Sequence, residues 1–539
     1  MLPIPGVKHG RRILTSVIEA HAKDKSEPWV SVPVDGQDLS QGYRDISFSG
    51  LNNAANHAAH WLRENLPETT EPFQCFAYAG PKDLRYPILA VAAAKLQKVM
   101  VLPSPLVTAE AQLQILEKKG CTIYLRPLSM AAPVEAVLQK APHIQAITVP
   151  DTEAFMQEAE AAPINYSKTW DEGRADPWLV FHTSGTTGNP KPVTYTHQMM
   201  CAADVVASIP DIGETQIHHY AQQRCYTPLP SLHFIGMTLS LSMTTFVHMT
   251  AVLGPPTPPT PDLISSILHH GRVTVAMLPP VLIDALCQSP SGLHSLSALN
   301  NLHFAGAPLS QNTASLLLPH VPITPGVGST EAGGYWTAIH PHRQDAWDHF
   351  SFDGKHTGIT FEPRANSNLH ELVFVKRPSC ALQPIFLLYP DLDRFETKDL
   401  WEEHPVHKGL WKIIGRTDDY IYLSHGDGLN AALLEPEIVA HPAVKLALIG
   451  GHGRPAPVLL IELLPTAEQE LRDDHGALVR SLLPYIEKVN TRCHECVRLS
   501  PERIILARAE KPFITTLKGS VARPQTLALY EEEIAKLFK

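Results

Sequence analysis

The sequence has few cysteines, no long apolar run and no excess of positive charge. Its eight cysteines are scattered over 539 residues, which fits free thiols in a reducing cytoplasm better than a disulfide framework. The most apolar helix-like stretch, 88–94, stops at Lys95 and is too short to cross a membrane. No apolar signal segment follows the basic residues near the N-terminus. A formal net charge of −10 provides no global field for nucleic acid or an anionic membrane. We therefore expect a cytoplasmic protein with no nucleic-acid or membrane partner.

Helical and strand-like patterns alternate along most of the chain. Apolar residues recur with helical spacing at 13–18 and 51–62. A Pro-rich stretch at 254–261 predicts a surface loop before a helix that begins near Asp262. This alternation indicates an α/β fold with largely parallel, buried strands. Short apolar runs predict strands at 99–102, 122–125, 144–149, 178–181, 273–277 and 302–305.

The pattern changes after about residue 410. Strand-like runs at 411–414, 420–423, 446–449 and 458–463 and a helical pattern at 527–538 predict a smaller α+β unit. One core rarely grows beyond roughly 250–300 residues, so this chain needs several. We place the boundary near 416–419 and predict a large α/β domain of several subdomains over 1–417 and a small α+β domain over 418–539.

One loop concentrates glycine, serine and threonine after a strand-like run. Glycine permits positive φ, so successive N–H groups can converge on one anion, and the hydroxyls add donors. A lysine supplies a point charge for phosphate oxygens. The GxxxxGK[ST] pattern of P-loop proteins is absent, so the loop predicts a phosphate site of another kind. Its predicted binding residues are Thr183, Ser184, Gly185, Thr186, Thr187, Gly188 and Lys191.

The string TSGTTGNPKPV at 183–193 resembles the phosphate-loop signature of the adenylate-forming superfamily. That superfamily comprises acyl-CoA synthetases, luciferases and adenylation domains of nonribosomal peptide synthetases (NRPSs). Further matching strings follow in the same order: FAGAPL at 304–309, GSTE at 328–331, DLW at 399–401, GRTDD at 415–419 and TTLKG at 515–519. The resemblance implies that the chain uses ATP and Mg²⁺ to convert a carboxylic acid into an acyl-AMP, with release of pyrophosphate.

The resemblance also implies roles for single residues. Lys518 is expected to bridge the reacting carboxylate and the α-phosphate, Thr330 to donate to that phosphate, and Glu331 to bind Mg²⁺. Asp399, an acceptor when ionised, suits the ribose hydroxyls, and Arg416 suits the ribose or a phosphate. The other residues expected to bind the nucleotide are Ala305, Gly306, Ala307, Val327, Gly328, Ser329 and Gly415.

Some positions depart from the superfamily pattern. Val327 stands where an aromatic residue usually stacks on adenine, and Lys518 precedes Gly519 where the common order is Gly-Lys. Residues 424–429 read SHGDGL where many members read closer to SNGEKV. These differences indicate a subfamily rather than inactivity. Asp418, inside the GRTDD string, is expected to be the hinge that makes the small domain mobile.

The strings GRTDDYIYL at 415–423, KPFITTLKGSVAR at 511–523 and LYEEEI at 529–534 resemble the adenylation domain of fungal NRPS-like carboxylic acid reductases. In those enzymes a carrier domain with a phosphopantetheine thiol and an NAD(P)H reductase domain follow. Neither a carrier serine nor a GxGxxG loop is visible, so this chain alone is expected to activate an acid but not to reduce it. The alternatives are a free-standing acyl- or aryl-CoA synthetase and an inactive acyl-binding scaffold.

The acid itself is constrained by residues 230–241, which read PSLHFIGMTLSL and contain no carboxylate. Amino-acid-activating relatives usually have an aspartate there, so an α-ammonium group would be left unpaired. His233 stands where aryl- and acyl-activating relatives carry a histidine beside the carboxylate and AMP. Aromatic side chains could enclose an aromatic acid or a quaternary ammonium acid, or could be ordinary core. The predicted pocket residues are His233, Phe234, Met237, Phe304, Gly333 and Tyr335.

Overall fold

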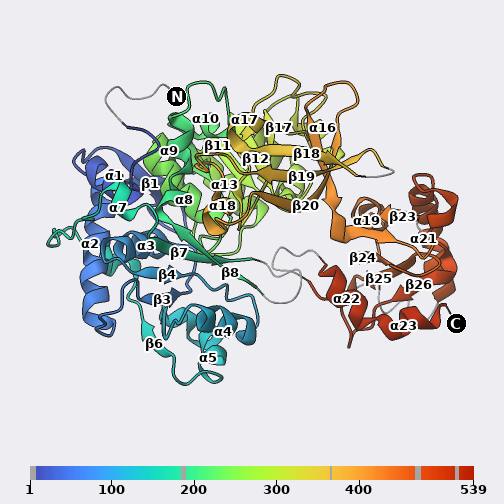
Figure 1. Ribbon diagram of the computed structural model, residues 1–539, viewed down its shortest axis with the longest axis horizontal. Coiled ribbons are helices and arrows are strands. Elements are labelled where there is room, and N and C mark those ends of the chain that lie inside the picture. Colours follow the sequence, from blue (N-terminus) through green and yellow to red (C-terminus); the bar gives the residue numbers. More distant parts are fainter. Residues whose placement is uncertain are drawn as a thin grey trace.

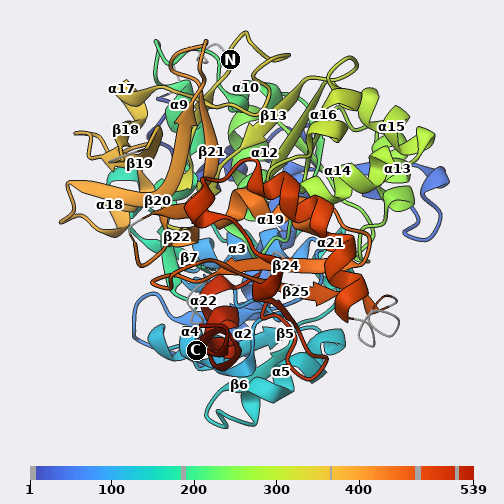
Figure 2. The ribbon, with the colours of Figure 1, turned by 90° about the vertical axis from the view of Figure 1, so that its right-hand side faces the viewer.

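The protein is seen in a computed structural model, which describes residues 8–183, 190–364, 367–425, 427–465, 467, 475–515 and 521–538. A large N-terminal domain is followed by a smaller C-terminal domain at the right of Figure 1. Seen from that side, the small domain lies in front of the large one (Figure 2). The predicted class, α/β with a large N-terminal and a small C-terminal domain, is confirmed.

A first sheet joins strands from distant parts of the large domain. In spatial order these are β13 (Ile323–Gly326), β12 (Asn301–Ala305), β11 (Val275–Leu278), β9 (Arg224–Tyr226), β10 (Thr250–Val252), β1 (Pro28–Pro33) and β2 (Tyr43–Ser47). Neighbours are parallel except β2, which runs antiparallel to β1 at the edge. Helices cover both faces, which is why strands such as β11 are apolar throughout rather than alternating.

A second sheet has the same character. In spatial order its strands are β6 (Gln145–Thr148), β5 (Ile123–Arg126), β3 (Cys75–Tyr78), β4 (Val99–Val101), β7 (Pro177–His182) and β8 (Pro192–Thr196). They are parallel except for β8, which folds back antiparallel on β7. The phosphate loop predicted from the sequence is therefore the connection of this β7–β8 hairpin.

An apolar layer fills the space between the sheets and forms one buried core with their facing sides. Ser47 accepts a hydrogen bond from the Gly50 N–H and so caps the longest of these helices. The layer's helices are α1 (Leu14–His21), α2 (Phe48–Asn65), α3 (Arg85–Lys95), α8 (His197–Met200), α9 (Ala202–Ala207) and α12 (Met243–Val247). The outer face of the first sheet is covered by α13 (Pro261–His270), α14 (Pro280–Cys287), α15 (Pro290–Ser297) and α16 (Gln311–Leu317). That of the second is covered by α4 (Ala109–Lys118) and α5 (Ala131–Leu138).

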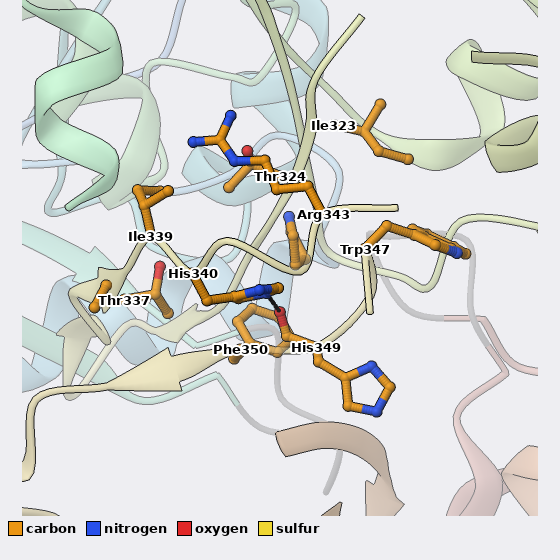
Figure 3. Close-up of a pocket in the computed structure, with 11 residues that line it drawn as sticks. Ile323, Thr324, Thr337, Ile339, His340, Arg343, Trp347, His349 and Phe350 are labelled. Atoms are coloured by element: carbon orange, nitrogen blue, oxygen red, sulfur yellow. Dashed lines mark hydrogen bonds between the residues drawn. The ribbon is translucent and has the colours of Figure 1, made fainter. Parts of the chain in front are cut away.

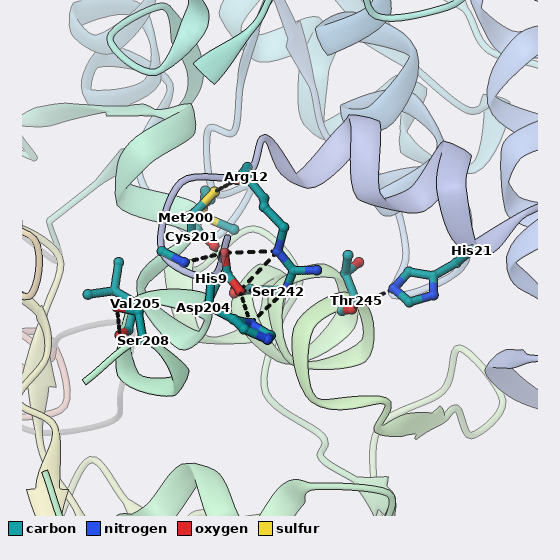
Figure 4. Close-up of polar contacts among 11 residues, drawn as sticks. His9, Arg12, His21, Met200, Cys201, Asp204, Val205, Ser208, Ser242 and Thr245 are labelled. Carbon is teal, nitrogen blue, oxygen red and sulfur yellow. Dashed lines mark hydrogen bonds and ion pairs between the residues drawn. The ribbon is translucent and has the colours of Figure 1, made fainter. Parts of the chain in front are cut away.

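Buried Asp204, in α9, holds the N-terminal segment 9–12 in place. Its carboxylate accepts from the Gly10 N–H at 2.7 Å, lies 2.9 Å from His9 Nδ1 and pairs with the Arg12 guanidinium (Figure 4). A fully buried carboxylate is tolerated only when it is paired and hydrogen-bonded, so these contacts tie the N-terminal segment to the layer between the sheets.

A third, antiparallel sheet completes the large domain. Its strands are β18 (Ile359–Pro363), β19 (Leu369–Val375), β20 (Arg394–Glu403) and β21 (Trp411–Arg416), in that order. Trp401 is fully buried against Phe350, Phe352 and Phe361. Short elements connect the sheets: α6 (Thr152–Phe155), α7 (Trp170–Gly173), α10 (Gln216–Tyr220), α11 (Phe234–Met237), β14 (Gly328–Ser329), β15 (Gly333–Gly334), β16 (Thr337–Ala338), β17 (Ser351–Phe352), α17 (Gly354–Thr357) and α18 (Pro384–Leu388).

The small domain is built on a sheet of β24 (Val444–Gly450), β25 (Val458–Leu463) and β26 (Ile504–Leu506). A hairpin of β22 (Tyr420–Tyr422) and β23 (Gly428–Asn430) precedes it. One face of the sheet packs against α19 (Ala431–Val439) and α21 (His475–Asn490), and the other against α22 (Arg523–Leu529) and α23 (Glu531–Lys536).

The predicted strands and the helices at 13–18, 51–62 and near Asp262 are confirmed. Two details at the C-terminal end are wrong. Residues 411–414 form β21, which pairs with β20 of the large domain rather than with the small domain. The helix predicted at 527–538 is two helices, α22 and α23, because Tyr530 leaves helical geometry and its hydroxyl donates to the Lys511 carbonyl. Within the described residues, none of the helices is both long and apolar enough to cross a membrane.

Candidate active site

The β7–β8 hairpin presents the phosphate loop. His182 is opposite Pro192, the Thr183 N–H donates to the Lys191 carbonyl at 3.0 Å, and the Lys191 N–H donates to Thr183 Oγ1 at 3.2 Å. These bonds close the base of the loop and leave Lys191 exposed. The other predicted phosphate-binding residues lie outside the described residues: Ser184, Gly185, Thr186, Thr187 and Gly188.

Buried His182 braces this loop, a role that the sequence did not reveal. Its Nε2 accepts from the Ser104 N–H at 3.0 Å, and its Nδ1 lies 2.9 Å from the Thr183 carbonyl oxygen. A carbonyl only accepts, so Nδ1 carries the proton and the ring is neutral. Burial lowers the pKa of His182, which agrees with that state. The ring therefore connects the ends of β4 and β7 at the entrance to the loop.

The GSTE string forms a tight turn between β14 and β15. Gly328 is opposite Gly334, Ser329 is opposite Gly333, and the Tyr335 N–H donates to the Val327 carbonyl at 3.1 Å. A Cβ on Gly328 would lie 2.5 Å from the Gly333 carbonyl oxygen, so only glycine fits at that position. The turn leaves Thr330 and Glu331 half-buried at its tip.

Tyr195 joins this turn to the phosphate hairpin. Its buried hydroxyl donates to the Thr330 carbonyl oxygen at 2.9 Å. Burial raises the pKa of Tyr195, and the nearby Glu331 carboxylate raises it further, so the hydroxyl stays protonated and remains a donor. Two predicted sites from different sheets, the phosphate loop and the Thr330–Glu331 pair, are thereby brought together.

Asp399 and Arg416 face each other across β20 and β21. They occupy paired positions, and Arg416 Nη1 lies 3.1 Å from Asp399 Oδ1. Asp399 is only 8% exposed, and burial raises the pKa of its carboxyl to about 6, although Arg416 acts in the opposite direction. Burial raises the pKa of Tyr335, and the nearby Asp399 carboxylate raises it further. The Tyr335 hydroxyl is hydrogen-bonded to Ser329. The predicted ribose residues thus lie beside the GSTE turn.

The predicted substrate residues fall into two groups. His233 stands at the N-terminal end of α11, with its N–H donating to the Pro230 carbonyl at 3.1 Å. The Phe234 ring lies 6.3 Å from the Tyr195 ring, and α11 runs beside β15, which contains Gly333. Met237 is fully buried in the core between the sheets. His233, Phe234 and Gly333 therefore belong to one neighbourhood, next to Thr330.

Phe304 belongs to the other group. It points to the outer face of the first sheet, where its ring lies 6.1 Å from Trp347 in the core with α13–α16. The following turn is open: Gly306 has φ +95°, and Gly306 and Ala307 are exposed while Ala305 is half-buried beside Gly326. Val327 packs against the core that holds Tyr335 and Phe374.

A lysine near α11, Lys82, was not predicted to belong to the site. The Lys82 ammonium donates to the Thr227 carbonyl and lines a cavity of about 20 Å³ with Ser231, Gly236 and Ser240. Burial lowers the pKa of Lys82 to about 7. In the sequence Lys82 is one charged residue in a polar loop, so nothing there marks it as enclosed.

A separate hollow of about 20 Å³ lies near β13 and β16, lined by Arg343, Trp347, His349 and Phe350 among others (Figure 3). His340 Nε2 lies 3.1 Å from the His349 carbonyl oxygen there. A hollow of this size holds about one water, so it is not a nucleotide site.

Family models and relatives agree with this geometry. The model of the AMP-binding enzyme family matches residues 21–355, and that of the AMP-binding enzyme C-terminal domain matches residues 418–539. The carboxylic acid reductase of Neurospora crassa is 29% identical over 98% of this chain and 51% of its own length. An isocyanide synthase–NRPS hybrid of Aspergillus fumigatus is 27% identical over 99% of this chain and 34% of its own. The chain thus spans about half or less of the length of these relatives.

Solved structures show the same fold. ATP-bound MatB from Rhodopseudomonas palustris superposes with a TM-score of 0.69 at 17% identity, covering 96% of this chain and 99% of that one. The anthranilate CoA ligase AuaEII with anthranoyl-AMP gives 0.69 at 15% identity, covering 97% and 98%. The family match over more than half of the sequence, together with the site geometry, establishes that the chain belongs to the AMP-binding enzymes, as an adenylate-forming domain homologous to those of fungal carboxylic acid and adenylate-forming reductases.

Proposed function

We propose that the chain converts a carboxylic acid and ATP into an acyl-AMP and pyrophosphate, and then passes the acyl group to a phosphopantetheine thiol on a carrier domain. The observation that carries the proposal is the Tyr195–Thr330 hydrogen bond, which places the phosphate hairpin beside the Thr330–Glu331 turn. A carboxylate oxygen of the acid bonds to the α-phosphorus, and the bond between the α-phosphorus and the bridging oxygen of pyrophosphate breaks. No proton has to move in this step.

The main obstacle is repulsion between two anions, so the site must supply positive charge and donors. In this proposal Thr183, Lys191 and the loop between them hold the phosphates, Thr330 donates to the α-phosphate, and His233 lies beside the acid carboxylate. Glu331, half-buried next to the hairpin, is a suitable carboxylate ligand for Mg²⁺. When bound, Mg²⁺ would neutralise charge on the phosphate oxygens.

The nucleoside would bind across the GSTE turn. Asp399 accepts from the ribose hydroxyls, and Arg416, whose side chain is 42% exposed, assists from the neighbouring strand. Adenine lies against backbone, because Val327 offers no aromatic face. The backbone around it would come from Ala305, Gly306, Ala307, Gly328, Ser329 and Gly415.

The partner domains are proposed from the relatives. Because relatives named as reductases extend well beyond the length matched here, a carrier and an NAD(P)H reductase domain are the partners we propose. The second candidate is an acyl- or aryl-CoA synthetase, which the fold shared with CoA ligases allows. Acylation of a carrier domain but not of free CoA would favour the first, and the reverse the second. An inactive scaffold would show no ATP–pyrophosphate exchange, whichever acid is supplied.

We expect the acid to be an aromatic or other non-amino acid, because residues 230–241, beside the proposed site, contain no carboxylate to pair an α-ammonium. ATP–pyrophosphate exchange should be faster with aryl acids or a quaternary ammonium acid than with proteinogenic amino acids. A panel with equal concentrations of each acid tests this. A free α-amino acid that clearly leads the panel would contradict it.

We further propose a domain boundary at 417/418, with Asp418 as the pivot between an adenylating and a thiol-accepting pose. The turn Thr417–Asp419 directly follows β21, so rotation there moves the small domain without disturbing the third sheet. Asp418→Pro, which fixes φ near −65°, should preserve one half-reaction and impair the other. Asp418→Ala, which leaves φ free, should retain both. Wild-type rates for pyrophosphate exchange and thiol acylation in Asp418→Pro would exclude the pivot.

Lys518 is proposed as the cation that bridges the acid carboxylate and the α-phosphate; it lies outside the described residues. The rival in the same segment, Lys511, is already engaged: its Nζ lies 2.7 and 2.9 Å from the Glu533 carboxylate and 4.5 Å from the centre of the Tyr530 ring. Lys518→Ala should slow exchange by about 10²–10³, the loss typical of one preorganised donor, and should spare transfer from a supplied acyl-adenylate. Lys511→Ala should affect exchange much less, and the opposite pattern would reassign the role.

The raised pKa of Asp399 predicts that ATP binding depends on pH. Its carboxyl has a pKa of about 6 without nucleotide, and only the ionised form accepts from both ribose hydroxyls. The KM for ATP should therefore rise as pH falls through about 6, by up to about tenfold per unit. The Asp399→Asn variant should have a higher KM for ATP, without the extra increase that the wild type shows as the pH falls through about 6. Because ATP titrates identically with both enzymes, parallel pH profiles for the two would rule out this assignment.

A further inference from the structure

A cluster of two histidines and a glutamate lies apart from the proposed active site. His21 is the last residue of α1, Glu27 precedes β1, and His248 follows α12. Their side chains are 16%, 19% and 34% exposed, and the His21 ring packs 5.0 Å from the fully buried ring of Phe48. In Figure 1, α1 lies at the end of the large domain away from the small domain.

The polar atoms of the two histidines converge on the Glu27 carboxylate. His21 Nδ1 lies 2.8 Å from Glu27 Oε2, and His248 Nδ1 lies 2.6 Å from Glu27 Oε1. One ligand atom from each of the three residues lies within 4.8 Å of the other two. The two imidazole rings meet edge to face, with centres 5.1 Å apart. A single carboxylate is thus shared by two imidazoles that approach it from different segments.

The second nitrogen of His21 fixes where its proton lies. Nε2 is 3.1 Å from the Thr245 carbonyl oxygen, and Figure 4 shows the ring directed at Thr245. A carbonyl only accepts, so Nε2 carries the hydrogen. In the neutral ring, the Nδ1 lone pair then faces a carboxylate oxygen, which is repulsive unless a positive charge lies between them. A second proton on His21 would supply that charge, with a neutral His248 donating its own Nδ1–H to the other carboxylate oxygen; a bound cation would supply it equally.

A metal ion would supply this positive charge and use all three side chains as ligands. Histidines that bind metals usually donate their other ring N–H to a backbone carbonyl or a carboxylate, as His21 does to Thr245. Two imidazole nitrogens and one carboxylate are a common ligand set for Zn²⁺ and similar ions, which leaves a further position for water. Around a tetrahedral Zn²⁺, ligand atoms are about 3.3 Å apart. The nitrogen–oxygen distances of 2.8 and 2.6 Å would have to open by about 0.5 and 0.7 Å to reach that value.

The backbone at His248 supports a specific role for its side chain. Its φ of 54° and ψ of 34° are left-handed, a conformation uncommon for residues other than glycine, although histidine adopts it more readily than most. A residue held in this conformation usually has a reason in its surroundings. Here the conformation ends α12 and directs the imidazole toward Glu27. We propose that His21, Glu27 and His248 form a binding site for a divalent transition-metal ion of the Zn²⁺ type, which ties α1 to α12.

The chain also contains a natural comparison, the trio His342, Asp345 and His407. Its ligand atoms also lie within 4.8 Å, but Asp345 is 61% exposed and the His342 and His407 rings are stacked with centres 3.7 Å apart. An exposed carboxylate is well hydrated and its side chain is not held, so this trio should bind more weakly. His407→Asn is therefore a matched control for substitutions at the proposed site.

The test uses the full chain without an affinity tag. Protein is equilibrated with Zn²⁺ and dialysed against a weak chelator, and bound metal is measured by elemental mass spectrometry. Wild type and His407→Asn should each retain one ion per chain. Glu27→Gln and His248→Asn, the latter chosen because asparagine tolerates positive φ, should bind Zn²⁺ at least about 100-fold more weakly. Pyrophosphate exchange, which the proposed site does not serve, should stay near wild type and shows that the variants are folded.

Thermal unfolding gives a second readout. Added Zn²⁺ should raise the melting temperature of wild type and His407→Asn, because an ion that binds only the folded state stabilises it. It should not raise that of Glu27→Gln or His248→Asn. The proposal is overturned if wild type retains no ion, or if Glu27→Gln and His248→Asn retain it as well as wild type does. The trio would then be an ion pair between a doubly protonated His21 and Glu27, with His248 hydrogen-bonded to the same carboxylate.

Discussion

The hydrogen bond from Tyr195 to the Thr330 carbonyl is the contact on which the active-site geometry depends. The phosphate hairpin belongs to the second sheet, whereas the GSTE turn follows the last strand of the first sheet. A chain with a net charge of −10 has no long-range attraction for ATP. It must therefore assemble donors locally, and the predicted donors lie where the two sheets meet. Because the bond is made by a buried phenol whose pKa is raised, it does not titrate in the physiological range.

Both loops that are expected to contact the phosphates are closed at the base by backbone pairing. Thr183 and Lys191 close one, and the bridge between Thr515 and Val521 closes the other, with the Ala522 N–H donating to the Ile514 carbonyl at 2.7 Å. The second loop is anchored further by Arg523. This buried guanidinium donates to Glu435 at 2.7 and 2.8 Å and to Asp419 at 3.1 Å. Since Asp419 ends the turn after β21, the return from the lysine loop and the start of the small domain are fastened at one point.

The sequence was sufficient where the determining interactions are local. The apolar stripe at 51–62 predicted α2, and the run at 302–305 predicted β12, because burial on one face of a helix or both faces of a strand leaves a periodic signature. The run at 411–414 was grouped with the strands of the small unit, although the predicted boundary at 417/418 left it in the large domain. The choice of a pairing partner depends on segments far away in the sequence. The side of the sheet on which Phe304 lies could not be predicted for the same reason. Period two puts it on the same side as Leu302, but only the assembled sheet shows that this is the outer face with Trp347.

The site residues divide in a similar way. Motif strings predict Thr330, Glu331 and Asp399 as site residues, because binding phosphate, a hard cation and ribose would require particular side chains in a fixed order. They do not reveal His182 or Lys82, whose environments arise only when separate strands meet. The same reasoning separates the two proposed cations of this chain. A lone carboxylate completed by phosphate oxygens suits Mg²⁺, whereas two imidazoles with a carboxylate suit a softer ion. Ligand chemistry thus distinguishes the two sites without any need for a difference in net charge.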